Sequence, residues 1–411
     1  MEQKKSHLDV ASIRKDFPIL EQEIYGKPLA YFDNAATTHK PNQVIDAVAH
    51  MYRYENSNIH RGVHYLSEQL TQRYESARAS VQKFIGAAEK EEVIFTKGTT
   101  ESINLVAFSF GEKFVQAGDE ILITAMEHHA NIVPWQMLCQ RKGAILKVLP
   151  VDDNGDLQLD KLEEYLSDTT RLVAVAHISN ALGTVNDVNF IIDKAHAKSI
   201  PVLIDGAQSV QHTVVDVQAM DCDFFVFSGH KLYGPTGIGV LYAKRKWLEQ
   251  MPPYQTGGEM IQKVSFEETT FNDIPFRFEA GTPNMAGAIG LERAITYVQD
   301  TGLEAIAAYE EELLQYATNK MKAMKGIRII GTARKKVSVL SFVFTDIHHL
   351  DAGMILDKMG VAVRTGHHCA EPIMHLMGVD GTIRASFSFY NTFQEIDRLF
   401  EGLEKVQQMF G

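Results

Sequence analysis

The stretch SGHKLYGPTG, residues 228–237, follows directly after the apolar run FFVF and places Lys231 among Gly, Ser, His and Pro residues. In open α/β sheets, ligands bind at the carboxyl ends of the strands, so a lysine just past a buried strand lies where a ligand is expected. A surface lysine whose stem lies along apolar side chains is the common alternative. The surrounding segments favour the ligand site.

Short apolar runs that end in Gly, Ser, Asn or Asp alternate with helical patterns through the middle of the chain. This alternation is typical of βαβ units, and it predicts an α/β fold with a mainly parallel sheet flanked by helices. The predicted strands are residues 92–96, 120–125, 172–179, 201–206, 224–229 and 239–243, and helical patterns include 99–110 and 188–198.

From about residue 286 the pattern changes to long amphipathic helices. Apolar positions spaced i, i+3, i+4, i+7 mark one helix from Ile306 to Met321 and another from Ile396 to Val406. Two strand-like runs, 337–344 and 360–365, lie between these helices. The pattern predicts a compact α+β unit at the C-terminal end.

The length of 411 residues exceeds the size at which one hydrophobic core usually stops growing. We therefore expect a large cofactor-binding domain at residues 31–290 and a smaller C-terminal domain at 291–411. The N-terminal segment, residues 1–30, is expected to pack with the smaller domain.

Composition narrows the classes of function. The 40 basic against 52 acidic side chains give a net charge of −12, which argues against nucleic acid or an anionic membrane as a partner. Three cysteines, none in a CxxC pair, indicate a reducing compartment. The charged start MEQKKSHLDV has no apolar run behind it, and no stretch approaches the roughly 20 apolar residues of a membrane span. We expect a cytoplasmic protein.

Asp205 closes the apolar run VLID, so its carboxylate and the Lys231 amine are expected at the same edge of the sheet. A pyridoxal phosphate (PLP) cofactor needs this pair, a lysine for its aldehyde and a carboxylate facing its pyridinium nitrogen. Taken alone, Asp205 is explained equally well as a turn or helix-capping aspartate.

FTKGTTESINLVA, residues 95–107, passes from a strand through Gly and two threonines into a helix. The free N–H groups of such a helix start bind phosphate, and Thr100, Ser228 and His230 would add further donors. Simple capping of the helix by Thr99 or Thr100 is the alternative.

A histidine pair follows the next strand, in MEHHANIVPW at residues 126–135. His128 is placed where an imidazole ring would lie flat on a pyridine ring. A lone histidine is more often structural, but a tandem pair just past a strand end favours the ligand site.

With these residues in place, the sequence resembles the fold-type I PLP enzymes, most closely the group II (SufS-type) cysteine desulfurases within the class-V aminotransferases. SGHK alone is shared with related PLP families, whereas the full set of motifs is highly specific. The similar segments span nearly the whole chain and include FDNAATT (32–38), NIHRGVHYLS (58–67), FEAGTPN (278–284), RTGHHCAEP (364–372) and RASFSFYNT (384–392).

The resemblance implies PLP as the cofactor, with a residue for each of its polar groups. Lys231 forms the Schiff base, Asp205 pairs with the pyridinium nitrogen and Gln208 bonds the ring hydroxyl. His128 stacks on the ring. The residues implied for the phosphate are Thr99, Thr100, Ser228 and His230, with Thr282 reaching in from the second subunit of an obligate homodimer.

The resemblance also implies how substrate is bound. Arg384, helped by Asn180, clamps the substrate carboxylate, a task that suits a planar guanidinium group. The other residues implied to line this pocket are His60, Arg61, Arg364 and His367.

Cys369 is the residue that separates a desulfurase from a transaminase. The substrate sulfur must leave to a thiolate nucleophile, which the basic motif RTGHH favours. A small buried hydrophobe describes Cys139 and Cys222 better. The resemblance thus implies conversion of L-cysteine to L-alanine with a persulfide on Cys369, and Lys231 and His128 complete the catalytic set.

The loop that carries Cys369 is short, because Cys369 lies five residues beyond Arg364 and Pro372 follows closely. Such a tether reaches at most ~18 Å. An acceptor must therefore come to the persulfide, and group II relatives similarly rely on SufE-like or SufU-like proteins. We expect such a partner, and iron–sulfur cluster assembly as the pathway. Some relatives carry an uncharged residue where this chain has Glu371, so the sequence does not predict the surface that contacts the acceptor.

Two alternatives remain. A selenocysteine lyase acting on L-selenocysteine would use the same fold, since a fold does not fix a reaction. From a different class, a metal-binding protein would use His367, His368, Cys369 and His375. Adjacent His-His-Cys is poor ligand spacing, because neighbouring side chains diverge, so no metal is expected.

Overall fold

The computed structural model of the chain describes residues 8–410. Its centre is a seven-stranded sheet in the order β4-β10-β9-β8-β7-β5-β6. Neighbouring strands are parallel except for β10, which is antiparallel to both β4 and β9. The predicted α/β fold with a mainly parallel sheet is confirmed. The strands are β4 (Val93–Thr96), β5 (Glu120–Thr124), β6 (Ile145–Leu149), β7 (Thr170–Ala176), β8 (Val202–Asp205), β9 (Phe224–Ser228) and β10 (Gly239–Ala243).

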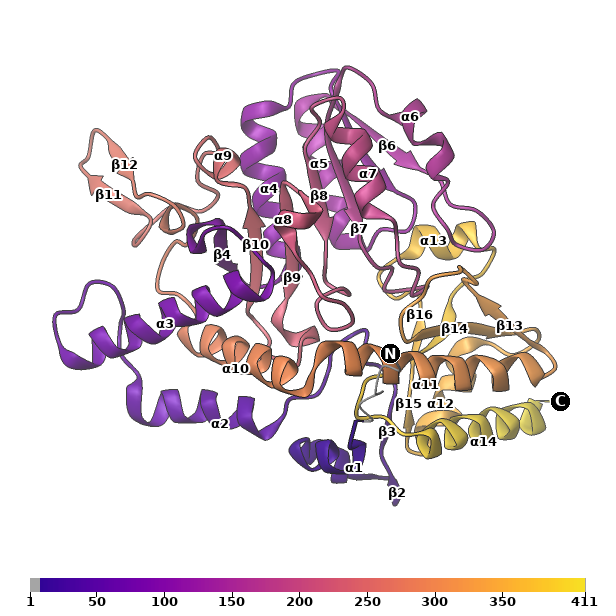
Figure 1. Cartoon of the computed structure of the whole chain (residues 1–411). Helices are drawn as coiled ribbons and strands as arrows, with labels where there is room; N and C mark the ends of the chain where they lie inside the picture. The colour runs from indigo at the N-terminus through magenta and orange to yellow at the C-terminus, as the bar shows by residue number, and fades with distance from the viewer. Residues whose placement is uncertain (1–7, 411) are drawn as a thin grey trace, which may run out of the picture.

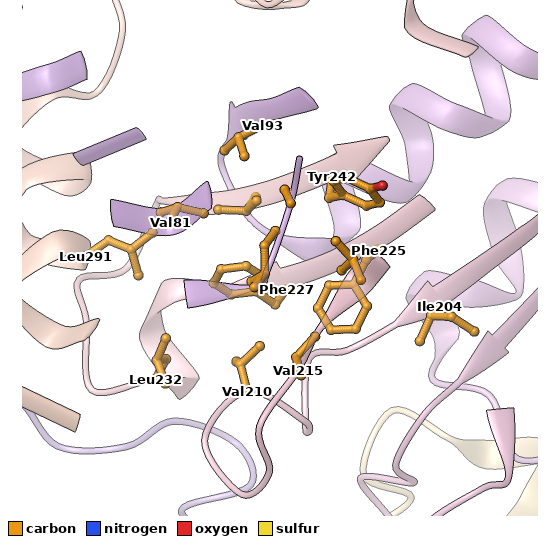
Figure 2. Close-up of a cluster of buried hydrophobic side chains, with 14 of the residues drawn as sticks. Val81, Val93, Ile204, Val210, Val215, Phe225, Phe227, Leu232, Tyr242 and Leu291 are labelled. Atoms are coloured by element: carbon orange, nitrogen blue, oxygen red, sulfur yellow. The ribbon is translucent and has the colours of Figure 1, made fainter. Parts of the chain in front are cut away.

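Side chains along each strand alternate between two apolar layers, because successive Cβ atoms point to opposite faces of a sheet. Phe225 and Phe227 of β9 belong to the layer under α3, α7 and α10, and Figure 2 shows their two rings within this cluster. Phe224 and Val226 belong to the opposite layer, under α4 and α5. These helices are α3 (Tyr65–Phe84), α4 (Thr99–Phe114), α5 (Val133–Lys142), α7 (Val188–His196) and α10 (Met285–Thr301).

Burial on both faces explains why the central strands were recognisable as continuous apolar runs. The sequence analysis missed β6, which lies at the edge of the sheet and pairs only with β5. Its residues are partly exposed and include Lys147, so no apolar run marks this strand.

A second, four-stranded antiparallel sheet has the order β13-β14-β17-β16. Helices α11, α12 and α14 pack on it around one apolar cluster, and Figure 1 shows these orange to yellow elements gathered beside the larger sheet. The elements are β13 (Ile327–Ile330), β14 (Val339–Phe344), β16 (Arg364–Gly366), β17 (Thr382–Ser386), α11 (Leu303–Ala323), α12 (His349–Lys358) and α14 (Phe393–Phe410).

The run at residues 360–365 is not one strand, as the sequence suggested, but two. β15 (Val361–Ala362) pairs in parallel with β3 (Ala30–Tyr31), whereas β16 pairs with β17. The chain therefore changes partner at Val363 and leaves Arg364 directly opposite Arg384.

The predicted domain boundary at residue 290 falls inside α10, which packs on α2 and α3. In the N-terminal segment, Phe17 packs edge-on against Phe389 and Tyr297 within the large cluster. Arg14 donates to the Tyr390 carbonyl of the C-terminal part. The division into domains stays a prediction, and residues 1–7 of the segment lie outside the described part.

The other elements are short, apart from α2. Among residues 8–410, the structure has no helix that is long and apolar enough to cross a bilayer. The remaining helices and hairpins are α1 (Val10–Ile13), α2 (Asn42–His50), α6 (Leu162–Tyr165), α8 (Val217–Met220), α9 (Arg245–Leu248), α13 (Glu371–Leu376), β1 (Glu23–Ile24) with β2 (Lys27–Pro28), and β11 (Ile261–Val264) with β12 (Thr269–Phe271).

Candidate active site

A cavity of about 220 Å³ opens at the carboxyl edge of the large sheet. Ala176, Asp205 and Ser228, which end β7, β8 and β9, all line it. Parallel strands end at one edge, so residues far apart in the sequence meet there. The predicted site residues that line the cavity are Thr99, Thr100, His128, Asn180, Asp205, Gln208, Ser228, His230, Lys231, Arg364, Cys369 and Arg384.

Lys231 ends the short helix η7 (Gly229–Lys231), which directly follows β9. Its side chain lies in the cavity, and within the described part of the chain its amine has no hydrogen bond or ion pair. Burial lowers the pKa of this amine to about 8, although the Asp205 carboxylate works in the opposite direction. The cavity therefore holds an uncommitted amine that is easily deprotonated.

The turn that carries Lys231 is fixed by the segment ATTHK, residues 36–40. The His230 carbonyl accepts hydrogen bonds from the Thr37 hydroxyl (3.1 Å), the Thr38 hydroxyl (3.2 Å) and the Lys40 amine (2.9 Å). Burial lowers the pKa of Lys40 to about 7. The sequence analysis gave Lys40 no role, because nothing local links it to residue 230.

Asp205 is buried at the end of β8, where one carboxylate oxygen accepts the Ala207 N–H at 2.9 Å. Burial raises the pKa of Asp205, while that hydrogen bond and the Lys231 charge lower it. The Gln208 side chain, also buried, donates to the Ala35 carbonyl at 2.6 Å. A carboxylate and an amide thus face the same cavity as the lysine.

The start of α4 meets the end of β9. Both the Thr99 N–H and the Thr99 hydroxyl bond the Ser228 hydroxyl, at 2.8 and 2.9 Å. Burial lowers the pKa of His230 to about 4, so its imidazole is neutral near pH 7. The N–H groups of the first helical turn, with Thr100 beside them, form the kind of end that binds phosphate.

His128 lies on the other side of the cavity, where it caps the short helix η5 (His129–Asn131). Its Nδ1 atom accepts the Ala130 N–H at 3.0 Å. Burial is the largest cause, and the Lys231 charge the second, that lower the pKa of His128 to about 3. A neutral ring of this kind suits stacking on a cofactor ring.

Arg384 is 1% exposed and is held between two acceptors. Its guanidinium donates to the Asn180 carbonyl and to the Asp33 carboxylate, both at 2.9 Å. Arg364 faces it across the β16–β17 pair, and its nearest Asp33 contact is 3.9 Å. Like charges on opposite strands are destabilising, and Asp33 compensates for both. The buried Arg384 Nε–H has no hydrogen-bond partner within residues 8–410.

Cys369 is exposed, and its sulfur lies 4.0 Å from a terminal nitrogen of Arg364. Cys139 and Cys222 are buried, as the sequence suggested. His368 and Cys369 both have φ near +55°, in the left-handed region that non-glycine residues rarely adopt. The surrounding contacts must therefore hold this loop in place.

Four predicted site residues lie outside the cavity of their own chain. His60 bonds Glu259 and Glu75, and the Arg61 side chain points to the same Glu259. The His367 ring packs against His375, with centroids 6.4 Å apart. The expectation that these three side chains line the pocket is therefore not met within one chain, because acidic or aromatic partners hold them elsewhere. Thr282, expected to act from a second subunit, lines a separate cavity of about 180 Å³.

Two residues were missed as members of the site. His368 lines the cavity, bonds Thr382 at 2.7 Å, and burial lowers its pKa to about 2. Asp33, the partner of Arg384, is part of the motif FDNAATT, so this motif could have pointed to Asp33 as a site residue.

Within residues 8–410, the four residues of the metal-binding alternative do not gather into one ligand cluster. His367, His368 and Cys369 point toward His375, Thr382 and Arg364. Among the residues described, no three His, Cys, Asp or Glu side chains come together in a way that holds a metal ion.

With this geometry in view, the comparisons with known proteins can be interpreted. The family model for class-V aminotransferases matches residues 30–399. The chain belongs to this family.

Several relatives are named cysteine desulfurases. The cysteine desulfurase of Enterobacter sp. (strain 638) is 53% identical over 98% of this chain and 99% of its own. The probable cysteine desulfurase of Mycolicibacterium paratuberculosis is 53% identical over 97% of this chain. This chain spans only 58% of the length of that relative. A crystal structure of the cysteine desulfurase CsdA from Escherichia coli, in an S-sulfonic acid form, matches with a TM-score of 0.91 and 38% identity, covering 98% of this chain and 99% of the other.

These matches confirm the fold-type I architecture and PLP as the cofactor of the family. The donor set of this chain fits PLP. An uncommitted amine, a buried carboxylate and a helix start with two hydroxyl groups face one cavity, and each suits a different polar group of PLP. Lys231 would hold the aldehyde and Asp205 the ring nitrogen. The phosphate would be held by Ser228 and Thr100.

Proposed function

We propose that this protein is a cysteine desulfurase, which uses PLP bound at Lys231 to move the sulfur of L-cysteine onto Cys369. One observation carries the proposal: an exposed thiol shares a single cavity with the enclosed Lys231 amine and the Asp205 carboxylate. A transaminase has no chemical use for a thiol in this position. The names of the full-length relatives support the same reaction.

When bound, PLP supplies an electron sink for negative charge that develops on the substrate. Asp205 would keep the ring nitrogen protonated, since its burial beside that nitrogen stabilises a positive charge. Lys231, with a pKa of about 8, is able to give up and take back a proton near neutral pH. His128 would pack on the ring without adding charge, because its pKa of about 3 leaves it neutral.

Arg384, which lines the cavity, would bind the substrate carboxylate through its guanidinium group, and the Asn180 carbonyl would fix that group. This contact would orient the substrate sulfur toward Cys369, whose sulfur lies 4.0 Å from a terminal nitrogen of Arg364. The Cys369 sulfur then forms an S–S bond as the Cβ–S bond of the substrate breaks. The electron pair of the broken bond stays on the substrate, which is protonated and leaves as alanine. Cysteine and a thiol thus give alanine and a persulfide, and no external oxidant is needed.

We further propose a homodimer that completes the site through Thr282. Support comes from exposed aromatic and apolar side chains between the end of α2 and the first residue of α3, namely Tyr52, Tyr54, Val63 and Tyr65. Sedimentation of the purified protein tests the dimer. In mixed dimers, Thr282→Ala in one chain should lower PLP affinity only at the partner's site.

The acceptor of the sulfur is proposed to be a SufE-like or SufU-like protein in the cytoplasm, feeding iron–sulfur cluster assembly. The exposed position of Cys369 supports transfer to a protein that docks from outside. Activity on L-selenocysteine stays a prediction, tested by the same assay with that substrate.

The decisive experiment measures alanine formation and the mass of persulfide-bearing peptides in wild type and in Cys369→Ser. We expect Cys369→Ser to keep the cofactor absorbance and to lose both the persulfide and acceptor-stimulated turnover. Cys139→Ser is the matched control and should behave as wild type, because that thiol is buried away from the cavity. Persulfide and stimulated turnover that survive in Cys369→Ser would refute the proposal.

A further inference from the structure

The loop around Cys369 is strained and is docked onto two other parts of the chain. His368 and Cys369 are both in the left-handed region. The Asn180 side chain donates to the His368 carbonyl at 2.7 Å, and the His129 N–H donates to the Cys369 carbonyl, also at 2.7 Å. A strained backbone persists only where its surroundings fix it, so the position of the Cys369 thiol depends on these contacts.

His129 makes a second contact, through its side chain. Its ring Nε2 accepts the Glu371 N–H at 3.0 Å. Glu371 is the first residue of α13, and the N-cap residue of that helix, Ala370, provides no side-chain cap. The first N–H groups of a helix have no partner within the helix, so His129 supplies an acceptor that the loop itself lacks.

His129 also immediately follows His128, the ring on the cavity wall. Both belong to the turn that leads into η5, and their ring centroids are 6.2 Å apart. The bonds from His129 therefore tie the loop of Cys369 to the same turn that presents His128 to the cavity. A shift of this turn would move both groups together.

We propose that His129 is a positioning residue that holds Cys369 over the cavity by bracketing its loop, through the backbone bond to Cys369 and the ring bond to Glu371. The consequence of this positioning, sulfur transfer to Cys369, rests on the proposed function. The docking itself does not depend on that reaction.

The test uses two substitutions at His129 in the PLP-loaded protein. His129→Phe keeps a planar ring but removes the acceptor, whereas His129→Gln retains an acceptor oxygen at the end of its side chain. His348→Phe is the matched control, because the exposed His348 ring also accepts an N–H at a helix start, that of Leu350 in α12.

Two measurements are made on each variant. Hydrogen–deuterium exchange of the peptide containing residues 369–372 reports the Glu371 N–H directly. Single-turnover transfer of sulfur from cysteine to Cys369 reports the position of the thiol, and the cofactor absorbance checks that the fold and the His128 side of the cavity are intact.

In His129→Phe we expect at least tenfold faster exchange in this peptide and at least tenfold slower transfer, with an unchanged cofactor spectrum. His129→Gln should restore most of the slow exchange and most of the transfer rate, and His348→Phe should match wild type. Wild-type exchange in His129→Phe, or no recovery in His129→Gln, would overturn the proposal. If wild type itself transfers no sulfur, the proposed function fails, while the exchange data still decide the docking role.

Discussion

The ionisation of Lys231 gives a quantitative prediction. Its pKa is about 8 instead of the ordinary 10.5. At pH 7 roughly 9% of such an amine is neutral, against roughly 0.03% for an ordinary lysine, a difference of roughly 300-fold. Only the neutral amine attacks the aldehyde of PLP, so capture of the cofactor by the apoenzyme should be fast at neutral pH.

The assay follows cofactor absorbance after mixing apoenzyme with PLP over a range of pH. The capture rate should rise about tenfold per pH unit below pH 8 and level off above it. Borohydride reduction and peptide mapping then identify the modified lysine. A rate that keeps rising to pH 10, or a label on another lysine, would refute the assignment.

Asp205→Asn tests how the surrounding charges set the pKa of Lys231. The Asp205 carboxylate raises the pKa of Lys231 against the effect of burial, so its removal should move the pH profile to lower pH. Lys336→Arg is the matched control, because burial also lowers the pKa of Lys336 to about 8, yet this lysine lies outside the cavity. A profile that moves to higher pH in Asp205→Asn would contradict the electrostatic argument.

Three further changes probe other parts of the structure. Glu279→Gln removes the carboxylate at 2.6 Å from Arg78, which is 0% exposed and keeps Glu75 at 3.2 Å. Because the Arg78 charge stays partly compensated, urea unfolding should show a loss of roughly 1.5–3 kcal/mol, and wild-type stability would contradict this. Asp33→Asn frees Arg384 from its 2.9 Å partner; alanine binding, measured by cofactor absorbance, should weaken about tenfold because the guanidinium is no longer fixed, and unchanged binding would argue against it. Ser228→Ala removes the hydroxyl that bonds both the Thr99 N–H and the Thr99 hydroxyl. PLP should bind about tenfold more weakly while pyridoxal, which lacks phosphate, is unaffected, and equal losses for both would exclude a phosphate role.

Much of the fold could be predicted because its signals are local. A buried strand needs a run of apolar residues, and its end needs a few small or polar ones, so β8 and β9 with Asp205 and Lys231 were recognisable from segments of about ten residues. Where burial is incomplete the signal fails, as at the edge strand β6. The antiparallel direction of β10 was also invisible, since the same apolar run serves either direction.

The sequence by itself therefore predicted which groups form the site: a lysine, a carboxylate, a helix start expected to bind phosphate, and a thiol, each recognisable within its own short motif. Tertiary structure alone decided how these groups are held. Asp33 reaches Arg384 across 351 positions, and His129 reaches the Glu371 N–H across 242. Such hydrogen bonds join segments that packing of the two sheets brings together. No local pattern encodes them, because their energy depends on a distance that exists only after the chain has folded.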